Sequence, residues 1–128
     1  MKKLLILPVL MLAACGGGSG DTLALDVKSP FGPDRAIRVS GDGRASCDEG
    51  GLQAMESEEV IRAREIEREA KPFAVAARTF GSPAPSRRFY TLRTTDGTVR
   101  WTEGGRGLPP VLAKMALLGI ELERRLCR

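Results

Sequence analysis

The stretch Phe89–Glu103 reads FYTLRTTDGTVRWTE, and its pattern specifies local structure more closely than any other part of the chain. Two runs rich in threonine, aromatic and branched residues flank Asp96 and Gly97, a dipeptide typical of a two-residue hairpin turn. Pairing outward from that turn predicts two antiparallel strands with one apolar and one polar face. The predicted pairs are Thr94 with Val99, Leu92 with Trp101, and Tyr90 with Glu103.

The C-terminal residues supply a layer that can cover the apolar face of this hairpin. Apolar residues recur there at three- and four-residue steps, which is the period of an amphipathic helix. Arg124, Arg125 and Arg128 lie at its C-terminal end, where positive charge suits the helix dipole. The apolar stripe consists of Leu108, Val111, Leu112, Met115, Leu118, Leu122 and Leu126.

Upstream, the region from residue 23 to residue 47 predicts further strands. Leu23, Leu25 and Val27 alternate with polar or small residues, and Ile37 and Val39 continue the pattern after a proline- and glycine-containing loop. Two turn lengths are open between the second and third strands. A two-residue turn places Arg38 opposite Cys47, whereas a three-residue loop with a left-handed Gly43 places Ile37 opposite Cys47. We choose the second, because it brings Cys47 to the apolar face.

The middle of the chain predicts one more helix. Ser57 can cap a helix with Glu58 and Glu59 in its first turn, and Pro72 ends or kinks it near Lys71. Residues 73–80 are apolar and fit either a continuing helix or a short strand. We therefore expect an α+β domain over residues 23–128: a small antiparallel sheet of about four to five strands, with a long C-terminal amphipathic helix packed on one face and a second, shorter helix.

The N-terminus has the layout of a secretory signal peptide. Lys2 and Lys3 precede an apolar stretch that is shorter than the roughly 20 residues of a membrane span. The run Leu12-Ala13-Ala14-Cys15 resembles the lipobox of bacterial lipoproteins. This resemblance implies a signal peptide at residues 1–14, lipid on Cys15 and anchoring in a cell envelope. Residues 15–22 then form a flexible glycine- and serine-rich tether. Gly16 follows the cysteine in place of an aspartate, so in an organism with two membranes we expect the outer one, facing the periplasm.

Cleavage changes both the charge and the cysteine count of the mature chain. Loss of Lys2 and Lys3 reduces 20 basic residues to 18 against 16 acidic ones, a net charge of +2, which argues against nucleic acid as a partner. With Cys15 lipidated, Cys47 and Cys127 remain as an even pair in an oxidising compartment. A disulfide between them would stabilise the fold by roughly 4.5 kcal/mol through loop entropy. A redox-active pair is the alternative, but the two cysteines lie far apart in sequence.

Few residues of the chain are suited to catalysis. It contains no histidine, which removes the commonest general base and the commonest metal ligand. The carboxylates of Glu65, Glu67 and Glu69 alternate with arginines and fit a solvated helix face. We expect no enzyme activity, no metal and no cofactor. The most notable surface is basic: the predicted register sets Arg93 opposite Arg100, and like charges so opposed favour a bridging acid. The candidate partner surface comprises Arg87, Arg88, Arg93 and Arg100, whose alternative interpretation is four solvated side chains.

The order of these elements resembles that of emfourin-like proteins, small bacterial inhibitors of thermolysin-type metalloproteases. The resemblance covers residues 23–126 and implies protease inhibition, although no inhibitory residue can be carried over. The favoured expectation is a non-enzymatic lipoprotein that binds or scaffolds another envelope component; the alternative is the inhibitor. The residues that carry the resemblance are Ile37-Arg38-Val39, Glu58-Glu59, Phe89-Tyr90-Thr91-Leu92 and Leu108-Pro109-Pro110-Val111-Leu112.

Overall fold

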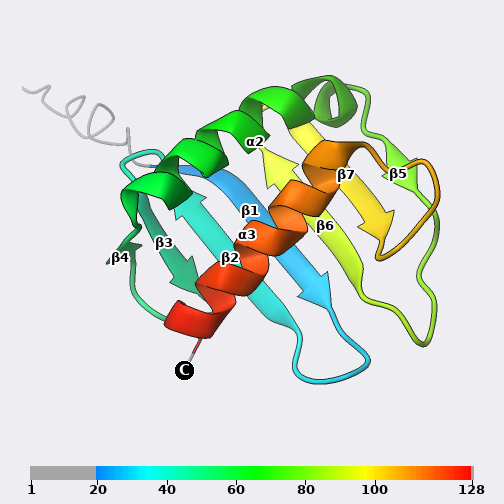
Figure 1. Cartoon of the computed structure of the whole chain (residues 1–128), viewed down its shortest axis with the longest axis horizontal. Coiled ribbons are helices and arrows are strands. Elements are labelled where there is room, and N and C mark those ends of the chain that lie inside the picture. The colour runs from blue at the N-terminus through cyan, green and yellow to red at the C-terminus, as the bar shows by residue number, and fades with distance from the viewer. Residues whose placement is uncertain (1–19, 128) are drawn as a thin grey trace, which may run out of the picture.

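A computed structural model describes residues 20–127 as an α+β domain, with seven strands and two helices in the order shown in Figure 1. The proposed signal peptide, Cys15 and most of the proposed tether lie outside the described residues. The elements are β1 (Asp21–Lys28), β2 (Arg35–Ser40), β3 (Arg44–Cys47), β4 (Gln53–Ala54), α2 (Ser57–Val75), β5 (Thr79–Phe80), β6 (Phe89–Thr94), β7 (Gly97–Thr102) and α3 (Pro110–Leu126). Within that range no helix is both long enough and apolar enough to cross a membrane.

All seven strands form one sheet in the order β4-β3-β2-β1-β6-β7-β5. This confirms the fold class, but the sheet has more strands than the four to five expected, and it is mixed because β5 runs parallel to β7. The two extra strands are β4 and β5, which lie at the two edges of the sheet. Each has two residues and is too short to show an alternating pattern in the sequence. β1 begins at Asp21, two residues before Leu23, the first residue of the alternating pattern.

The β2–β3 turn has the predicted three-residue form. Val39 lies opposite Ala45 and Ile37 opposite Cys47. Gly43 has a φ of +85°, the left-handed conformation that this loop requires. Cys47 therefore lies on the apolar face, as expected.

The register of the β6–β7 hairpin differs from the prediction, although its faces do not. Thr94 lies opposite Gly97 and Leu92 opposite Val99, so the turn residues are Thr95 and Asp96. Gly97 is needed for another reason: a Cβ there would lie 2.2 Å from the carbonyl oxygen of Ala74 in α2. The turn lies one residue earlier than predicted, and each residue of β6 pairs with a residue two positions earlier in β7 than predicted. A shift of two residues leaves every side chain on its predicted face.

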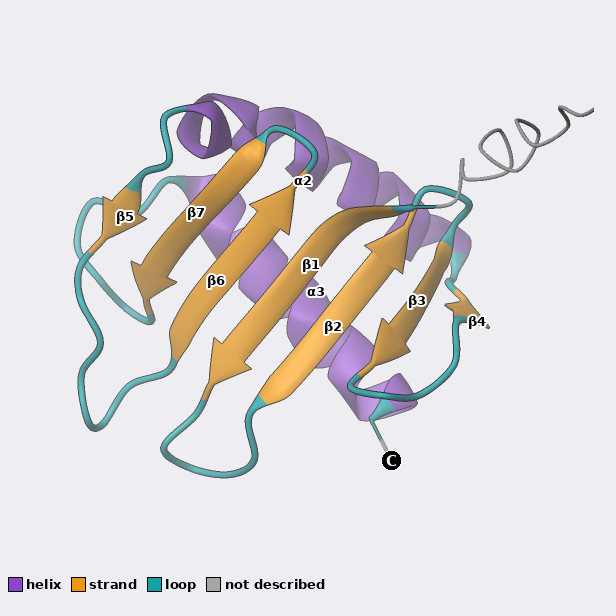
Figure 2. Ribbon diagram, turned by 180° about the vertical axis from the view of Figure 1, so that it is seen from behind, coloured by secondary structure: helices purple, strands orange, loops and turns teal. Residues whose placement is uncertain are grey.

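Both helices pack on the same face of the sheet, and among residues 20–127 no helix lies on the opposite face, which we call the open face (Figures 1 and 2). α2 has 19 residues and α3 has 17, so the expectation that the second helix is the shorter was wrong. Pro72 does not end α2, which continues to Val75 before residues 79–80 form β5. Glu56, rather than Ser57, caps the helix in a capping box with Glu59.

The core lies between the helices and the sheet. Tyr90 stacks on Trp101 with ring centroids 4.9 Å apart. A Cβ at Gly119 would lie 2.9 Å from Leu25, so this glycine allows α3 to approach β1 closely. The apolar stripe of α3 is buried apart from its first residue, Leu108, which packs against the core while partly buried. The largest fully buried side chains are Trp101, Leu23, Leu25, Ile37, Ile66, Leu92, Leu112, Met115, Leu118, Leu122 and Val99.

Candidate binding site on the open face of the sheet

Three of the four candidate arginines lie around one hollow on the open face, which we call the open-face groove. Arg93 and Arg100 point there from β6 and β7, because they alternate with the buried Leu92, Val99 and Trp101. Arg87 reaches the groove from the β5–β6 loop. The groove has a volume of about 930 Å³. It is lined by Asp26, Val27, Lys28, Ser29, Pro30, Asp34, Arg35, Ala36, Asp48, Pro83, Ala84, Pro85, Arg87, Phe89, Thr91, Arg93 and Arg100.

The floor of the groove follows directly from the strand register. Asp26 of β1 pairs with Ala36 of β2 on one side and with Thr91 of β6 on the other, and Thr91 pairs with Arg100 of β7. Paired residues share a face, so these four residues form one row across the sheet. The loops at residues 29–34 and 81–88 extend from the same end of the sheet (Figure 2), and both contribute prolines to the groove.

The fourth arginine, Arg88, lies on the other side of the sheet. Its Nη1 is 2.9 Å from Oε2 of Glu103, and its guanidinium carbon is 5.4 Å from the ring centroid of Phe31. Since neighbouring residues in a strand-like segment point to opposite faces, Arg87 and Arg88 could not both reach the groove. The predicted four-arginine surface is therefore a three-arginine surface.

The predicted opposition of Arg93 and Arg100 is also wrong, because of the shift in hairpin register. Arg93 lies opposite Thr98, and Arg100 lies opposite Thr91. Arg93 instead bonds Asp26 of β1, with Nη2 3.0 Å from Oδ2. Repulsion between Arg93 and Arg100 therefore does not support an acidic ligand, because the charge of Arg93 is already balanced by Asp26.

Arg100, Arg87 and Lys28 form no ion pair with an acidic residue among residues 20–127. Arg87 donates to a backbone carbonyl, that of Glu103 at 3.3 Å, which holds its position without cancelling its charge. The groove contains five basic residues against three acidic ones. It is consequently an electropositive surface, and the uncompensated cations lie at its two sides: Lys28 on β1, Arg87 and Arg100 toward β7.

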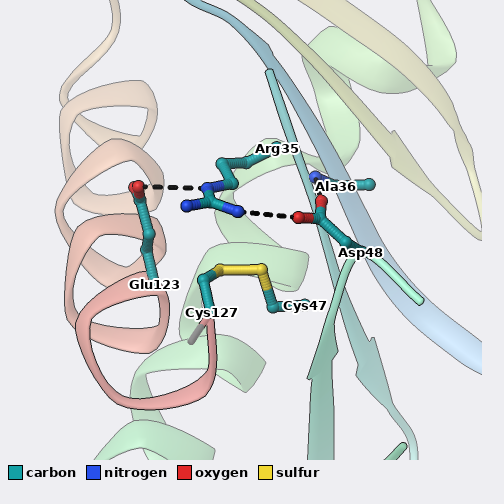
Figure 3. Close-up of a disulfide and its surroundings, with 6 residues drawn as sticks. All are labelled: Arg35, Ala36, Cys47, Asp48, Glu123 and Cys127. Atoms are coloured by element: carbon teal, nitrogen blue, oxygen red, sulfur yellow. Dashed lines mark hydrogen bonds and ion pairs between the residues drawn. A yellow bond between two sulfur atoms is a disulfide. The ribbon is translucent and has the colours of Figure 1, made fainter. Parts of the chain in front are cut away.

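The disulfide lies next to an ion-pair network at the edge of this region (Figure 3). Cys47 and Cys127 are bonded, with Cα atoms 5.2 Å apart. Asp48 accepts from the backbone N–H of Ala36 at 2.8 Å and from Arg35 at 2.9 Å. Burial opposes the charged form of Asp48, but these two donors outweigh it and hold the pKa of its carboxyl below the usual value. The sequence predicted the bridge; it offered no signal for the network.

Ion pairs between α2 and α3 were also missed by sequence reasoning. Glu59 is buried and pairs with Arg125, and Arg62 pairs with Glu121 at 2.5 Å. The hydrogen bond from Arg62 is the main reason that the pKa of Glu121 lies below its usual value. These pairs join helices about 60 residues apart in sequence, so no local pattern could have identified them.

Residues 20–127 contain no group of three or more cysteine or acidic side chains arranged to hold a metal ion. The chemistry that the groove offers is charge, shape and apolar contact, without a converging set of acid, base and nucleophile. Comparison of the chain with protein-family models, with curated proteins and with solved structures finds no match.

Proposed function

We propose that this protein is a membrane-anchored envelope lipoprotein that binds an acidic partner through the open-face groove and catalyses no reaction. The observation that carries the proposal is the set of uncompensated cations, Lys28, Arg87 and Arg100, on a sheet face that neither α2 nor α3 covers in the described part of the chain. Like charges gathered on one surface repel one another, and an acidic ligand relieves that repulsion.

Two features support the envelope location. Leu12-Ala13-Ala14-Cys15 has the form of a lipobox, and the Cys47–Cys127 bond belongs to an oxidising compartment. Lipid on Cys15 would anchor the chain durably, since about 0.8 kcal/mol accrues for each buried methylene group. In a cell with two membranes, the proposed location is the outer membrane, with the domain facing the periplasm.

The anchor is tested by expressing the full chain beside Cys15→Ser, with Cys47→Ser as the matched cysteine control. We expect mass spectrometry to find a diacylglyceryl group on Cys15 of the wild type and of the control, and both proteins to sediment with membranes. Release of Cys15→Ser from the membranes supports the proposal. An unmodified, soluble wild-type protein refutes the anchor.

The partner is tested by site-specific photo-crosslinking in the native host. A photoreactive residue replaces Thr91, on the floor of the groove, and a control replaces Leu117, which is exposed on α3 and faces away from the sheet. We expect a discrete adduct from the Thr91 position that disappears when Arg87 and Arg100 are both changed to glutamine. An adduct that persists in that double variant, or no adduct from the groove, refutes binding through these charges.

A second candidate function is inhibition of a thermolysin-type metalloprotease, as in emfourin-like proteins. It is favoured by the order of elements, in which the acidic-capped α2, the β6–β7 hairpin and α3 after Leu108-Pro109-Pro110 follow the N-terminal strands. Tight, stoichiometric inhibition of one enzyme in a panel of such proteases would support it. No inhibition across the panel at micromolar protein would exclude it.

A further inference from the structure

From the geometry of the open-face groove we infer that its ligand is an extended peptide segment with two acidic side chains four residues apart and an apolar side chain midway, of the form acidic-x-apolar-x-acidic. This inference rests on the proposed function, and it specifies the class of the acidic partner and the spacing of its charges.

The spacing comes from the positions of the two cations that flank the floor. Lys28 lies opposite Phe89, and Arg100 lies opposite Thr91, two residues further along β6. Two strand spacings of about 4.8 Å and two residues of about 3.4 Å separate their Cα atoms by about 12 Å. An extended chain covers that distance in about four residues, and its residues i, i+2 and i+4 face the same side.

The midpoint between the two cations is apolar. The line from Lys28 to Arg100 crosses β6 between Phe89 and Thr91, and Phe89 is only partly buried. Pro83 and Pro85 of the β5–β6 loop also line the groove. A leucine-sized side chain at position i+2 would contact this apolar part while its neighbours at i and i+4 meet the cations.

The acidic residues of the groove do not block either cation. Asp26 is bonded to Arg93, in the direction away from Lys28. Asp34 accepts the backbone N–H of Ser29 at 3.0 Å and forms no ion pair among the described residues. Lys28 and Arg100, like Arg87, thus have no acidic partner among residues 20–127, and they are the two cations whose positions the strand register fixes.

A peptide suits this surface better than a carbohydrate or a nucleic acid does. Of the 17 residues that line the groove, 7 are apolar. Its lining contains neither tryptophan nor tyrosine, and neither asparagine nor glutamine. Sulfated or phosphorylated sugars would leave the apolar part uncovered, and bases would find no pair of aromatic rings on which to stack. An extended peptide satisfies both the apolar and the charged parts at once.

The test uses the full chain in nonionic detergent at physiological salt, where non-specific attraction is screened beyond about 8 Å. The probe is fluorescein-labelled acetyl-Thr-Glu-Thr-Leu-Thr-Glu-Thr-amide, and binding is followed by fluorescence anisotropy. We expect Lys28→Gln and Arg100→Gln each to weaken binding about tenfold, the effect of one charge-assisted hydrogen bond. Arg68→Gln is the matched control, because Arg68 is exposed on α2, unpaired among residues 20–127 and remote from the groove. It should leave binding unchanged.

The spacing is tested by an isomeric peptide with adjacent glutamates, acetyl-Thr-Glu-Glu-Leu-Thr-Thr-Thr-amide, which should bind about tenfold more weakly. Peptides with a single glutamate should each lose sensitivity to one of the two variants, Lys28→Gln or Arg100→Gln, and retain it for the other. Equal binding of the two isomers, or equal loss in Arg68→Gln, overturns the inference.

A heparin-derived oligosaccharide separates this inference from the proposed function. If the oligosaccharide binds in a Lys28- and Arg100-dependent way and the peptide does not, the peptide inference fails while binding of an acidic partner stands. The peptide inference also fails alone if no peptide binds but the groove crosslink to a host component depends on Arg87 and Arg100.

Discussion

Breaking the disulfide should reduce the free energy of unfolding by about 4.5 kcal/mol. Cys47 and Cys127 are separated by 80 residues, and a loop of that length loses this amount of chain entropy when it is closed in the unfolded state. A domain of this size is typically stable by about 5–15 kcal/mol. The bond therefore accounts for a large share of the total.

Breaking the disulfide should change the free energy of the folded state much less than it changes the conformational entropy of the unfolded state. The last turns of α3 are also held by Arg125, which pairs with Glu59, and by Glu123, which pairs with Arg35 at 3.4 Å. The reduced protein should thus keep its native fold, and the effect of the bond should arise mainly from the unfolded ensemble. The dependence of the free energy on urea should become steeper, because the unlinked chain exposes more surface.

The assay is urea unfolding followed through the fluorescence of Trp101, the single tryptophan, in a Cys15→Ser background. Oxidised protein is compared with protein that has been reduced and alkylated after unfolding, and with the Cys47→Ala, Cys127→Ala double variant. For a slope of about 1–2 kcal/mol/M, the midpoint should fall by about 2–4.5 M urea. Midpoints of the oxidised protein and the double variant within about 0.5 M of each other would refute the loop-entropy reasoning.

Three further predictions concern single side chains, and urea unfolding measures each of them. Gly97→Ala should cost about 2–4 kcal/mol, because the new Cβ meets the carbonyl of Ala74 at 2.2 Å and φ is +147°; an unchanged midpoint would contradict that contact. The pKa of Asp48 is lower in the folded than in the unfolded state, so its contribution to the free energy of unfolding is complete above the unfolded-state pKa and is lost as pH falls below about 4. Asp48→Asn should make the free energy of unfolding less dependent on pH in this acid range, and a pH profile identical to that of the wild type would contradict the prediction. Arg125→Gln removes the ion-pair partner of the buried Glu59, which then keeps only its hydrogen bond from the N–H of Glu56, and should cost about 1–3 kcal/mol. Arg100→Gln should cost almost nothing; equal losses would contradict this distinction.

The faces of the sheet could be predicted from the sequence because they depend only on alternation and on turn parity. The choice of a three-residue loop at Gly43 placed Cys47 on the apolar face. The pairing with Cys127 was predicted separately, from the even pair of cysteines that remains once Cys15 is lipidated. The β6–β7 hairpin illustrates the limit of this reasoning. Gly97 was interpreted as a turn residue, but its function is to admit the carbonyl of Ala74, a tertiary contact that the local pattern does not contain.

The parts that sequence reasoning missed are held together by non-local contacts. β4 and β5 have two residues each, and their pairing depends on where the preceding loop or α2 delivers the chain. The length of α2 was underestimated because Pro72 suggested an end; the helix continues to Val75 although a proline removes a helical hydrogen bond and crowds the carbonyl four residues before it. For the candidate site, Arg93 and Arg100 could be assigned to a face, but Arg88 was assigned to the wrong one. The Asp26–Arg93 pair required the position of β1 beside β6.

Two groups of arginines in this domain have different physical effects. Arg35, Arg62 and Arg125 each pair with an acid on another element, and each pair joins α3 to the sheet or to α2. Arg100, by contrast, forms no ion pair between elements of the described chain, and together with Arg87 it raises the positive potential of the groove. Because the first group already holds the helix layer, the fold does not need the second group, and its mutual repulsion is unfavourable without a ligand. Substitutions of Arg87 and Arg100 should consequently weaken ligand binding without lowering the free energy of unfolding. A loss of binding in these variants can therefore be attributed to the groove itself.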